Sequence, residues 1–175
     1  LADTGPEIQE GRRRMRERIA TRVSVIPHNV SPPRKLEVLR MASWRNTMGR
    51  SLMLRCPFYE AQAGNCTVWK YREIECTTFF CKHDAGADGE DFWKSLRSYM
   101  VHVERRLADH AVMTVMPDYK DPPGTGMTLE ELEDRPPAPK LYSALWRGWE
   151  GREEELYIRC YEVIAGLSRL GCTPC

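Results

Sequence analysis

The sequence predicts a mostly α-helical protein, a small helical domain with an irregular, cysteine-rich metal-binding segment. Three observations lead to this fold class. Apolar residues recur at helical spacing on both sides of residues 50–86. The segment 50–86 has no sustained helical period, and it holds four of the seven cysteines. The chain of 175 residues, 42% hydrophobic and 29% charged, is long enough to bury a core without disulfides.

The first predicted helix covers residues 6–25, where Pro6 suits the first turn. Three prolines in residues 26–33 predict a break after it. We therefore expect a basic N-terminal helical arm over residues 1–33 and a helical domain over residues 34–175. The apolar stripe of the arm is thin, and arginines cover most of its remaining surface: Arg12, Arg13, Arg14, Arg16, Arg18 and Arg22.

Two further helices are predicted on either side of the cysteine segment. Residues 34–49 form the earlier one, which Gly49 ends. Residues 86–115 carry the clearest helical pattern of the chain, and Asp88 is a candidate N-cap. Its apolar stripe is expected to face the core: Phe92, Leu96, Met100, Val103, Leu107 and Ala111.

A Pro/Gly-rich connector over residues 116–139 precedes the last helical region. Within it, Thr128 and Glu131 have the spacing of a capping box, which predicts a short turn of helix. Residues 140–170 form one helix or a pair of helices broken near Gly148 or Gly151. On the apolar stripe of this region, Cys160 is most simply a small buried thiol.

The charge of the chain is unevenly distributed. Residues 1–55 carry 12 Lys/Arg against 5 Asp/Glu, whereas residues 56–175 carry 14 against 20. We expect the basic arm to pack on the acidic remainder, and binding of nucleic acid by the basic half is the less favoured interpretation. No membrane span or signal peptide is apparent, so we expect a reducing, cytoplasmic location. Clustered cysteines in such a compartment more often bind metal or perform redox chemistry than form bridges.

The stretch CPFYEAQAGNCTVWKYREIECTTFFC contains the cysteine cluster, at spacing C-x9-C-x9-C-x4-C. Four thiolates suffice for a soft cation or an iron–sulfur cluster. The long gaps fit the tight knuckles of structural zinc poorly, while iron–sulfur ligands have varied spacings. A disulfide pair and four buried thiols are the alternatives. Gly64 and Asn65 predict a turn that lets the chain reverse. The candidate metal ligands are Cys56, Cys66, Cys76 and Cys81.

This stretch resembles the YkgJ-type cysteine-cluster family, also described as zinc- or iron-chelating domains, whose motif is also seen in flagellin lysine-N-methylases. The family pattern is roughly C-P-F-L, a spacer, then G-x-C-x-I-Y-x-x-R-P-x-x-C-x-x-F-x-C. The chain matches its four cysteines, the Pro-Phe pair, the glycine, the arginine and the phenylalanine. It departs from the pattern at Tyr59, Trp69 and Glu73, and residues 1–55 lack the upstream cysteines that many members carry. The resemblance covers only residues 56–81.

The resemblance implies a bound iron–sulfur cluster, 4Fe-4S being favoured, or a metal ion such as zinc. A guanidinium at Arg72 would offset the negative charge of four thiolates. Trp69 and Phe79 would wall the site from water. His83 is a weaker candidate ligand, and the tail cysteines Cys172 and Cys175 are candidates to join the site.

We therefore expect an iron–sulfur protein used for electron transfer, redox sensing or the ordering of a partner surface. The alternative is a structural-zinc interaction module whose Arg-rich helix, residues 7–25, binds a protein partner. A methylase-like or redox enzyme is a further alternative. The sequence assigns no catalytic residue, because it contains no Gly-rich phosphate loop, nucleophile elbow or H-E-x-x-H motif.

Overall fold

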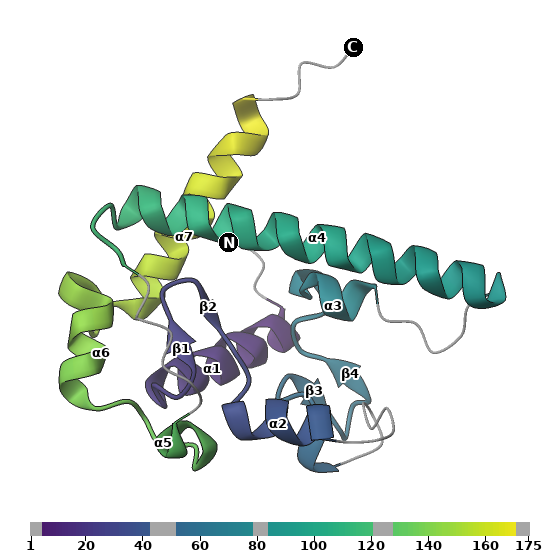
Figure 1. Ribbon diagram of the computed structural model, residues 1–175, viewed down its shortest axis with the longest axis horizontal. Helices are drawn as coiled ribbons and strands as arrows, with labels where there is room; N and C mark the ends of the chain where they lie inside the picture. Colours follow the sequence, from purple (N-terminus) through teal and green to yellow (C-terminus); the bar gives the residue numbers. More distant parts are fainter. Residues whose placement is uncertain (1–4, 43–51, 79–83, 121–127, 171–175) are drawn as a thin grey trace.

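The computed structural model describes residues 5–42, 52–78, 84–120 and 128–170, and these residues are mostly helical (Figure 1). The predicted mostly α class is thereby confirmed. In the described part of the chain, strands occur only as two short antiparallel hairpins. No helix in these four ranges combines the length and apolar character needed to cross a membrane.

The first helix, α1 (Pro6–Ala20), is shorter than the predicted 6–25. It ends because Arg22 and Ser24 adopt φ angles of 59° and 52°, in the left-handed region that a right-handed helix cannot include. The prediction of helix to residue 25 was therefore wrong. The chain instead forms a hairpin of two short strands: β1 (Val25–Ile26) and β2 (Asn29–Val30).

The segment around the cysteines consists of short elements, as its lack of helical period predicted. It follows α2 (Arg34–Ala42), which begins where the predicted second helix begins. The expected end of that helix at Gly49 lies outside the described residues. The elements of the segment are η1 (Leu52–Leu54), β3 (Tyr59–Glu60), β4 (Asn65–Cys66), η2 (Trp69–Tyr71) and α3 (Ile74–Thr77).

The long helix α4 (Gly86–Val115) has the predicted bounds, but Asp88 is not its N-cap. Ala85 occupies that position and supplies no side-chain hydrogen bond. Asp88 lies instead in the first turn, where a negative charge suits the positive end of the helix dipole.

The apolar stripe of α4 is fully buried only at its C-terminal end and is partly covered in its middle. Ala111 is 1% exposed, whereas Phe92 is 60% exposed. Figure 1 shows the N-terminal end of α4 extending past α3 and the rest of the drawn elements. The expectation that Phe92 faces the core was wrong. Helical period shows which residues share a face, but not whether another element covers that face.

The C-terminal half follows the predicted pattern of short turn, helix, break and helix. Thr128 and Glu131 form the capping box that opens α5. The break after α6 is confirmed, with a left-handed φ of 51° at Arg147 and of 80° at Gly151. The elements of this half are α5 (Leu129–Leu132), α6 (Pro139–Trp146), η3 (Arg147–Trp149) and α7 (Glu153–Leu170).

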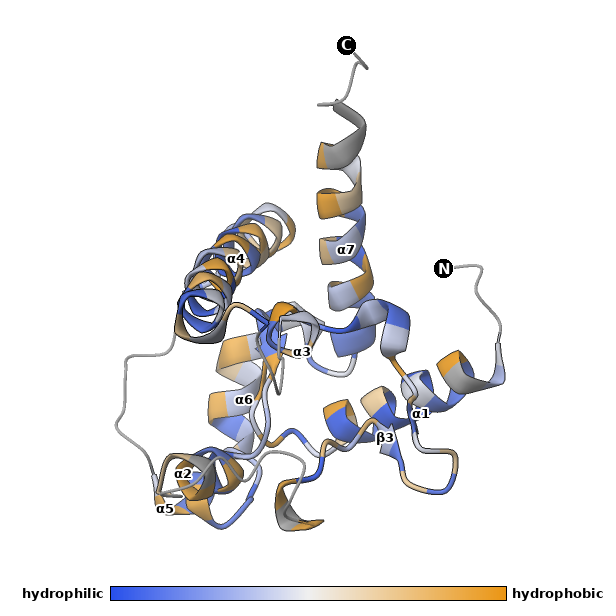
Figure 2. Cartoon of the chain, turned by 90° about the vertical axis from the view of Figure 1, so that its right-hand side faces the viewer, coloured by the Kyte–Doolittle hydropathy of each residue, from blue (hydrophilic) through white to orange (hydrophobic). Residues whose placement is uncertain are grey.

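The core lies where the end of α4, α6, α7 and β1 meet. Tyr142, Trp146 and Leu156 are each 0% exposed. In Figure 2, apolar and polar residues recur along both α4 and α7, as amphipathic helices require. The buried carboxylate of Glu153 accepts hydrogen bonds from the Tyr142 hydroxyl and the Gly151 N–H, each at 3.0 Å. The hydroxyl of Tyr142 and the carboxylate of Glu153 therefore satisfy their hydrogen bonding inside the core.

Candidate metal centre

The β3–β4 hairpin brings the first two cysteines toward each other. Tyr59 pairs with Cys66 across the hairpin, and Cys56 lies just before β3. The predicted chain reversal occurs at Gly64, whose φ of 66° is a conformation that glycine adopts without steric cost. The Thr67 hydroxyl and N–H both donate to the Phe58 carbonyl at 2.9 Å, which fixes the hairpin base.

The backbone N–H groups of Phe58 and Tyr59 are near the Cys56 sulfur, and the Tyr59 N–H donates to the Cys56 carbonyl oxygen at 3.1 Å. Partial burial raises the pKa of the Cys56 thiol, and the nearby Cys66 and Glu73 raise it further, while the two N–H donors lower it. An N–H group near a sulfur stabilises a thiolate, the form that binds metal. The Cys-Pro-Phe-Tyr turn therefore presents its sulfur to a set of backbone dipoles that suits a ligand.

The third cysteine, Cys76, lies on the single-turn helix α3, which two side chains of α4 hold in place. Glu104 accepts the Ile74 N–H at 3.2 Å, at the start of α3. At its end, the guanidinium of Arg97 donates to the hydroxyl and carbonyl oxygens of Thr78, at 3.1 and 2.9 Å. The position of Cys76 is therefore set by contacts to a helix that the cysteine motif does not include.

The three described cysteines of the motif lie close enough for their charges to interact. Burial raises the pKa of the Cys76 thiol, and the charges of Glu73, Cys56 and Cys66 raise it further, whereas Arg72 lowers it. Among the residues that the structure describes, no group of three or more His, Cys, Asp or Glu side chains is arranged to hold a metal ion. The three thiols thus share one neighbourhood without forming a closed ligand set.

Several predicted site residues fall outside the described ranges. They are the fourth motif cysteine, one of the two predicted wall aromatics, the weaker histidine candidate and the tail pair: Cys81, Phe79, His83, Cys172 and Cys175. Cys160 is described and half-buried, and it packs against the core on α7. It is therefore a core thiol, as its position on the apolar stripe predicted.

Arg72 and Trp69 form a stacked pair beside the thiols. The Arg72 guanidinium lies 3.4 Å from the centre of the Trp69 ring, and its Nε donates to the Trp69 carbonyl at 3.1 Å. The charge of Arg72 lowers the pKa of Cys76, as expected for a cation near the site. Trp69 is 62% exposed, and its role as a wall of the site stays a prediction.

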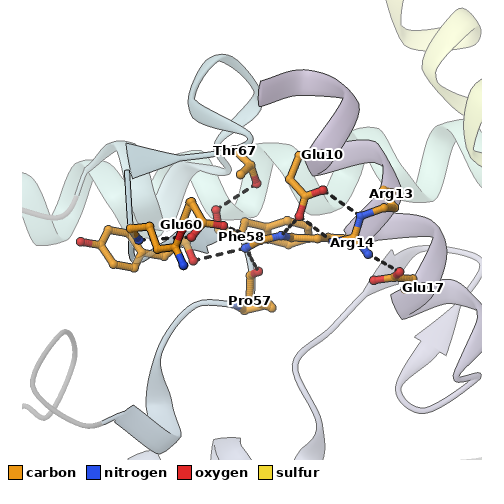
Figure 3. A network of polar contacts seen from close by, with 10 residues as sticks. Glu10, Arg13, Arg14, Glu17, Pro57, Phe58, Glu60 and Thr67 are labelled. Carbon is orange, nitrogen blue, oxygen red and sulfur yellow. Dashed lines mark hydrogen bonds and ion pairs between the residues drawn. The ribbon is translucent and has the colours of Figure 1, made fainter. Parts of the chain in front are cut away.

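A polar clamp from α1 holds the hairpin, and sequence reasoning did not find it (Figure 3). Arg14 Nη1 donates to the carbonyl oxygens of Pro57 and Tyr59, at 2.9 and 3.2 Å, and Nη2 pairs with Glu60. Glu10 orients this guanidinium from one turn away, through an ion pair at 2.6 Å. The sequence offered only an arginine-rich face, with nothing to distinguish Arg14 from its neighbours.

The backbone of α1 also touches the segment directly at Gly11. A Cβ at this position would lie 2.6 Å from the Thr67 carbonyl oxygen and 2.8 Å from a Val68 methyl group. The absence of a side chain therefore allows α1 to approach the hairpin base. The sequence around Gly11 contains no turn or capping signal. The need for glycine there comes from contacts with residues more than fifty positions further along the chain.

Two arginines of α1 and one just after it pair with acidic residues of the rest of the chain. Arg16 pairs with Glu154 at 2.8 Å and Arg22 pairs with Glu150 at 2.9 Å. Together with the Arg14–Glu60 pair, these contacts confirm the expectation that the basic arm packs on the acidic remainder. They also show that α1 contacts both the cysteine segment and α7.

Comparison of the chain with protein-family models, curated proteins and solved structures found no match. The resemblance to the YkgJ-type pattern therefore stays a prediction based on the motif residues.

Proposed function

We propose that this chain is a metal-binding protein that holds an iron–sulfur cluster through Cys56, Cys66, Cys76 and Cys81. The observation that supports this proposal most directly is that Cys56, in the loop before β3, Cys66 on β4 and Cys76 on α3 act electrostatically on one another. Unrelated thiols would not be expected to lie this close in a segment with so little regular structure.

The surroundings of Cys56 and Cys76 raise the pKa of both thiols, chiefly through burial, but two features act in the opposite direction. Phe58 and Tyr59 place backbone N–H groups near the Cys56 sulfur, and Arg72 places a cation near Cys76. Both features stabilise thiolates. Glu73 acts in the opposite sense, because its charge raises the pKa of both thiols, which favours loading at higher pH. When bound, a cluster of this kind would supply one-electron transfer.

The zinc-module alternative, with the Arg-rich helix as binding arm, has less support. The guanidinium groups of Arg14, Arg16 and Arg22 already pair with carboxylates of the same chain. A partner would have to displace these ion pairs. A reducing, cytoplasmic location remains part of our proposal because it suits free thiols. A protein partner remains part of it because electron transfer needs a second redox protein.

The decisive measurement is iron, zinc and acid-labile sulfide analysis of protein purified without oxygen, together with its visible spectrum. We expect iron with labile sulfide and a brown protein. A colourless protein with stoichiometric zinc would replace the cluster by structural zinc. A protein with neither metal would contradict the proposal.

Two cysteine variants test the ligand assignment against a matched control. Cys66→Ser should lose the metal, because it removes one of four ligands. Cys160→Ser changes an equally half-buried cysteine that packs on the core, and it should retain the metal. Equal loss of metal in both variants would contradict the assignment.

A further inference from the structure

The outer side of α4 carries an apolar stripe that is partly open to water. This outer stripe consists of Phe92, Leu96, Tyr99 and Val103. Phe92 is 60% exposed and Tyr99 is 65% exposed, and the other two side chains are half-buried. The spacing of four, three and four residues places the four side chains along one line of the helix, as in the seam of a coiled coil.

The inner side of the same helix is already covered. Arg97 and Glu104 bind the two ends of α3. Helical geometry places Arg97 about 140° around the axis from Phe92, so the outer stripe points away from the side on which α3 packs. Figure 2 shows α4 at one margin of the molecule, and Figure 1 shows its N-terminal end extending past α3. The outer stripe is therefore accessible to a second molecule.

Two residues of opposite charge flank the outer stripe. Asp91 precedes Phe92 by one position, and Arg105 follows Val103 by two. Both charged side chains belong to exposed residues, and neither makes a hydrogen bond or an ion pair with another residue that the structure describes. Asp91 acts on the nearby Lys94 only through its charge. The outer stripe thus has a negative end and a positive end.

The other charges on this part of α4 leave that pattern intact. Lys94 pairs with Glu90 at 2.6 Å, and Arg106 pairs with Asp109 at 3.3 Å, so each of these cations has a carboxylate on its own helix. Asp88 is exposed and adds a negative charge at the end that already holds Asp91. A surface that is complementary to the outer stripe must therefore be apolar along its centre, with a cation near one end and an anion near the other.

We propose that this surface is the outer stripe of a second copy of the chain, packed in the antiparallel direction to form a dimer. A two-fold axis beside residues 97–98 brings Phe92 of each copy against Val103 of the other. The same axis brings Leu96 of each copy against Tyr99 of the other. The apolar side chains that one copy leaves partly exposed are thus covered by the same set on the second copy.

Charge complementarity selects the direction of packing. The antiparallel arrangement places Asp91 of each copy beside Arg105 of the other, so that the contact occurs twice in the dimer. A parallel arrangement would instead bring each charge beside its own copy. Because the interface consists of a single pair of helix faces, we expect weak association in the micromolar range. This inference goes beyond the proposed function and does not depend on the metal centre.

Sedimentation velocity of the full chain tests for the dimer. The protein is purified without oxygen and kept in a reductant, so that its cysteines do not cross-link two copies. As the concentration rises from about 2 to 500 µM, we expect the mass to increase from that of one chain, 20.3 kDa, toward that of two. A chain that stays monomeric over this range would overturn the proposal and would leave the outer stripe to a different partner.

Exchanging the flanking charges tests the antiparallel arrangement. Asp91→Arg alone and Arg105→Asp alone each bring like charges together across the interface, and each should weaken dimerisation by about tenfold. The variant with both substitutions restores opposite charges at both ends and should recover most of the affinity. The two positions lie about 21 Å apart along α4, so a contact within one copy cannot produce this recovery. A double variant that dimerises as weakly as the single variants would overturn the arrangement.

Truncation of an exposed ring locates the interface. Phe92→Ala removes one ring from each copy and should weaken dimerisation by about tenfold. Trp69→Ala is the matched control, because Trp69 is 62% exposed and lies beside the N-terminal end of α1. Lys94→Ala controls for the loss of a charge on the other side of α4, and both controls should dimerise like the unmodified chain. Circular dichroism shows whether each variant is folded. Equal weakening by Phe92→Ala and Trp69→Ala would overturn the assignment to the outer stripe.

Discussion

The helical core and the cysteine segment are stabilised in different ways. In the core, Tyr142, Trp146 and Leu156 are fully buried. Among the side chains of residues 52–78 whose burial the structure describes, those of Thr67 and Thr78 are buried, and both are polar. Apolar burial therefore stabilises the core, whereas hydrogen bonds and ion pairs from α1 and α4 hold the cysteine segment.

This difference has a functional consequence. A segment with little apolar burial gains little free energy from folding by itself, so it depends on its neighbours and on any bound group. The thiols gather in this segment and not in the core. The comparison leads us to expect that changes in the core affect the whole molecule, while changes at the contacts of the segment act locally.

The largest expected effect follows from truncating the centre of the core. Trp146→Ala removes a ring that is 0% exposed and should lower the free energy of unfolding by about 3–5 kcal/mol. Urea denaturation followed by circular dichroism measures the change. Trp69→Ala, at a ring that is 62% exposed, is the control and should change stability by less than about 0.5 kcal/mol. Similar losses of unfolding free energy in the two variants would contradict the expected difference between the core and the cysteine segment.

A methyl group at Gly11 tests the close approach of α1 to the hairpin. Gly11→Ala places a Cβ 2.6 Å from the Thr67 carbonyl oxygen, and the strain should exceed the gain in helix propensity, for a net loss of about 1–2 kcal/mol. Gly166→Ala is the matched control, because nothing lies within 4 Å of its added Cβ in α7.

The control Gly166→Ala should instead raise the free energy of unfolding, by about 0.5–1 kcal/mol, because alanine favours a helix more than glycine does. Thermal and urea denaturation of both variants give the comparison. A gain at both positions would show that the α1–hairpin contact is looser than the structure indicates.

Removing the clamp tests how the cysteine segment is held. Arg14→Ala leaves the carbonyl oxygens of Pro57 and Tyr59 without their charged donor. We expect this to lower the free energy of unfolding by about 1–2 kcal/mol. Hydrogen exchange should report faster opening of residues 55–66. Arg13→Ala removes an exposed guanidinium that pairs only within α1, with Glu10 and Glu17, among the contacts the structure gives.

Arg13→Ala, the control, should lower the free energy of unfolding by less than about 0.5 kcal/mol, as is usual when an exposed ion pair is lost. Faster exchange of residues 55–66 in the Arg13 variant, equal to that in the Arg14 variant, would remove the distinction between the two arginines.

The smallest expected effect is the change in stability when the pH is lowered through the range in which Glu10 titrates. Hydrogen bonds from Arg13 and Arg14 lower the pKa of Glu10 from 4.5 to about 2. Because the pKa is lower in the folded state, this carboxylate stabilises the fold above pH 4.5, and its contribution is lost as the pH falls toward 2. Glu10→Gln should show a shallower loss of melting temperature over this interval than the unmodified chain. Glu162→Gln, on α7, controls for the loss of one charge, and a pH profile like that of Glu10→Gln would contradict the assignment.

The cysteine segment shows how far the sequence could lead. The motif pointed to four thiols, and the Gly64–Asn65 pair predicted the reversal that the hairpin makes at Gly64. The contacts that position the thiols were not predictable. Arg14, Arg97 and Glu104 are ordinary charged residues on helices, and no local pattern marks which of them reaches a backbone group far along the chain.

By itself, the sequence determined the features that depend on nearest neighbours. These are the bounds of α4, the capping box of Thr128 and Glu131, and the break between α6 and α7. Each follows from propensity, capping or backbone freedom within a few residues. Only the tertiary structure decided that Phe92 is exposed, that Gly11 meets Thr67 and that Cys56 lies near Cys76, because burial and long-range contact depend on where distant elements pack.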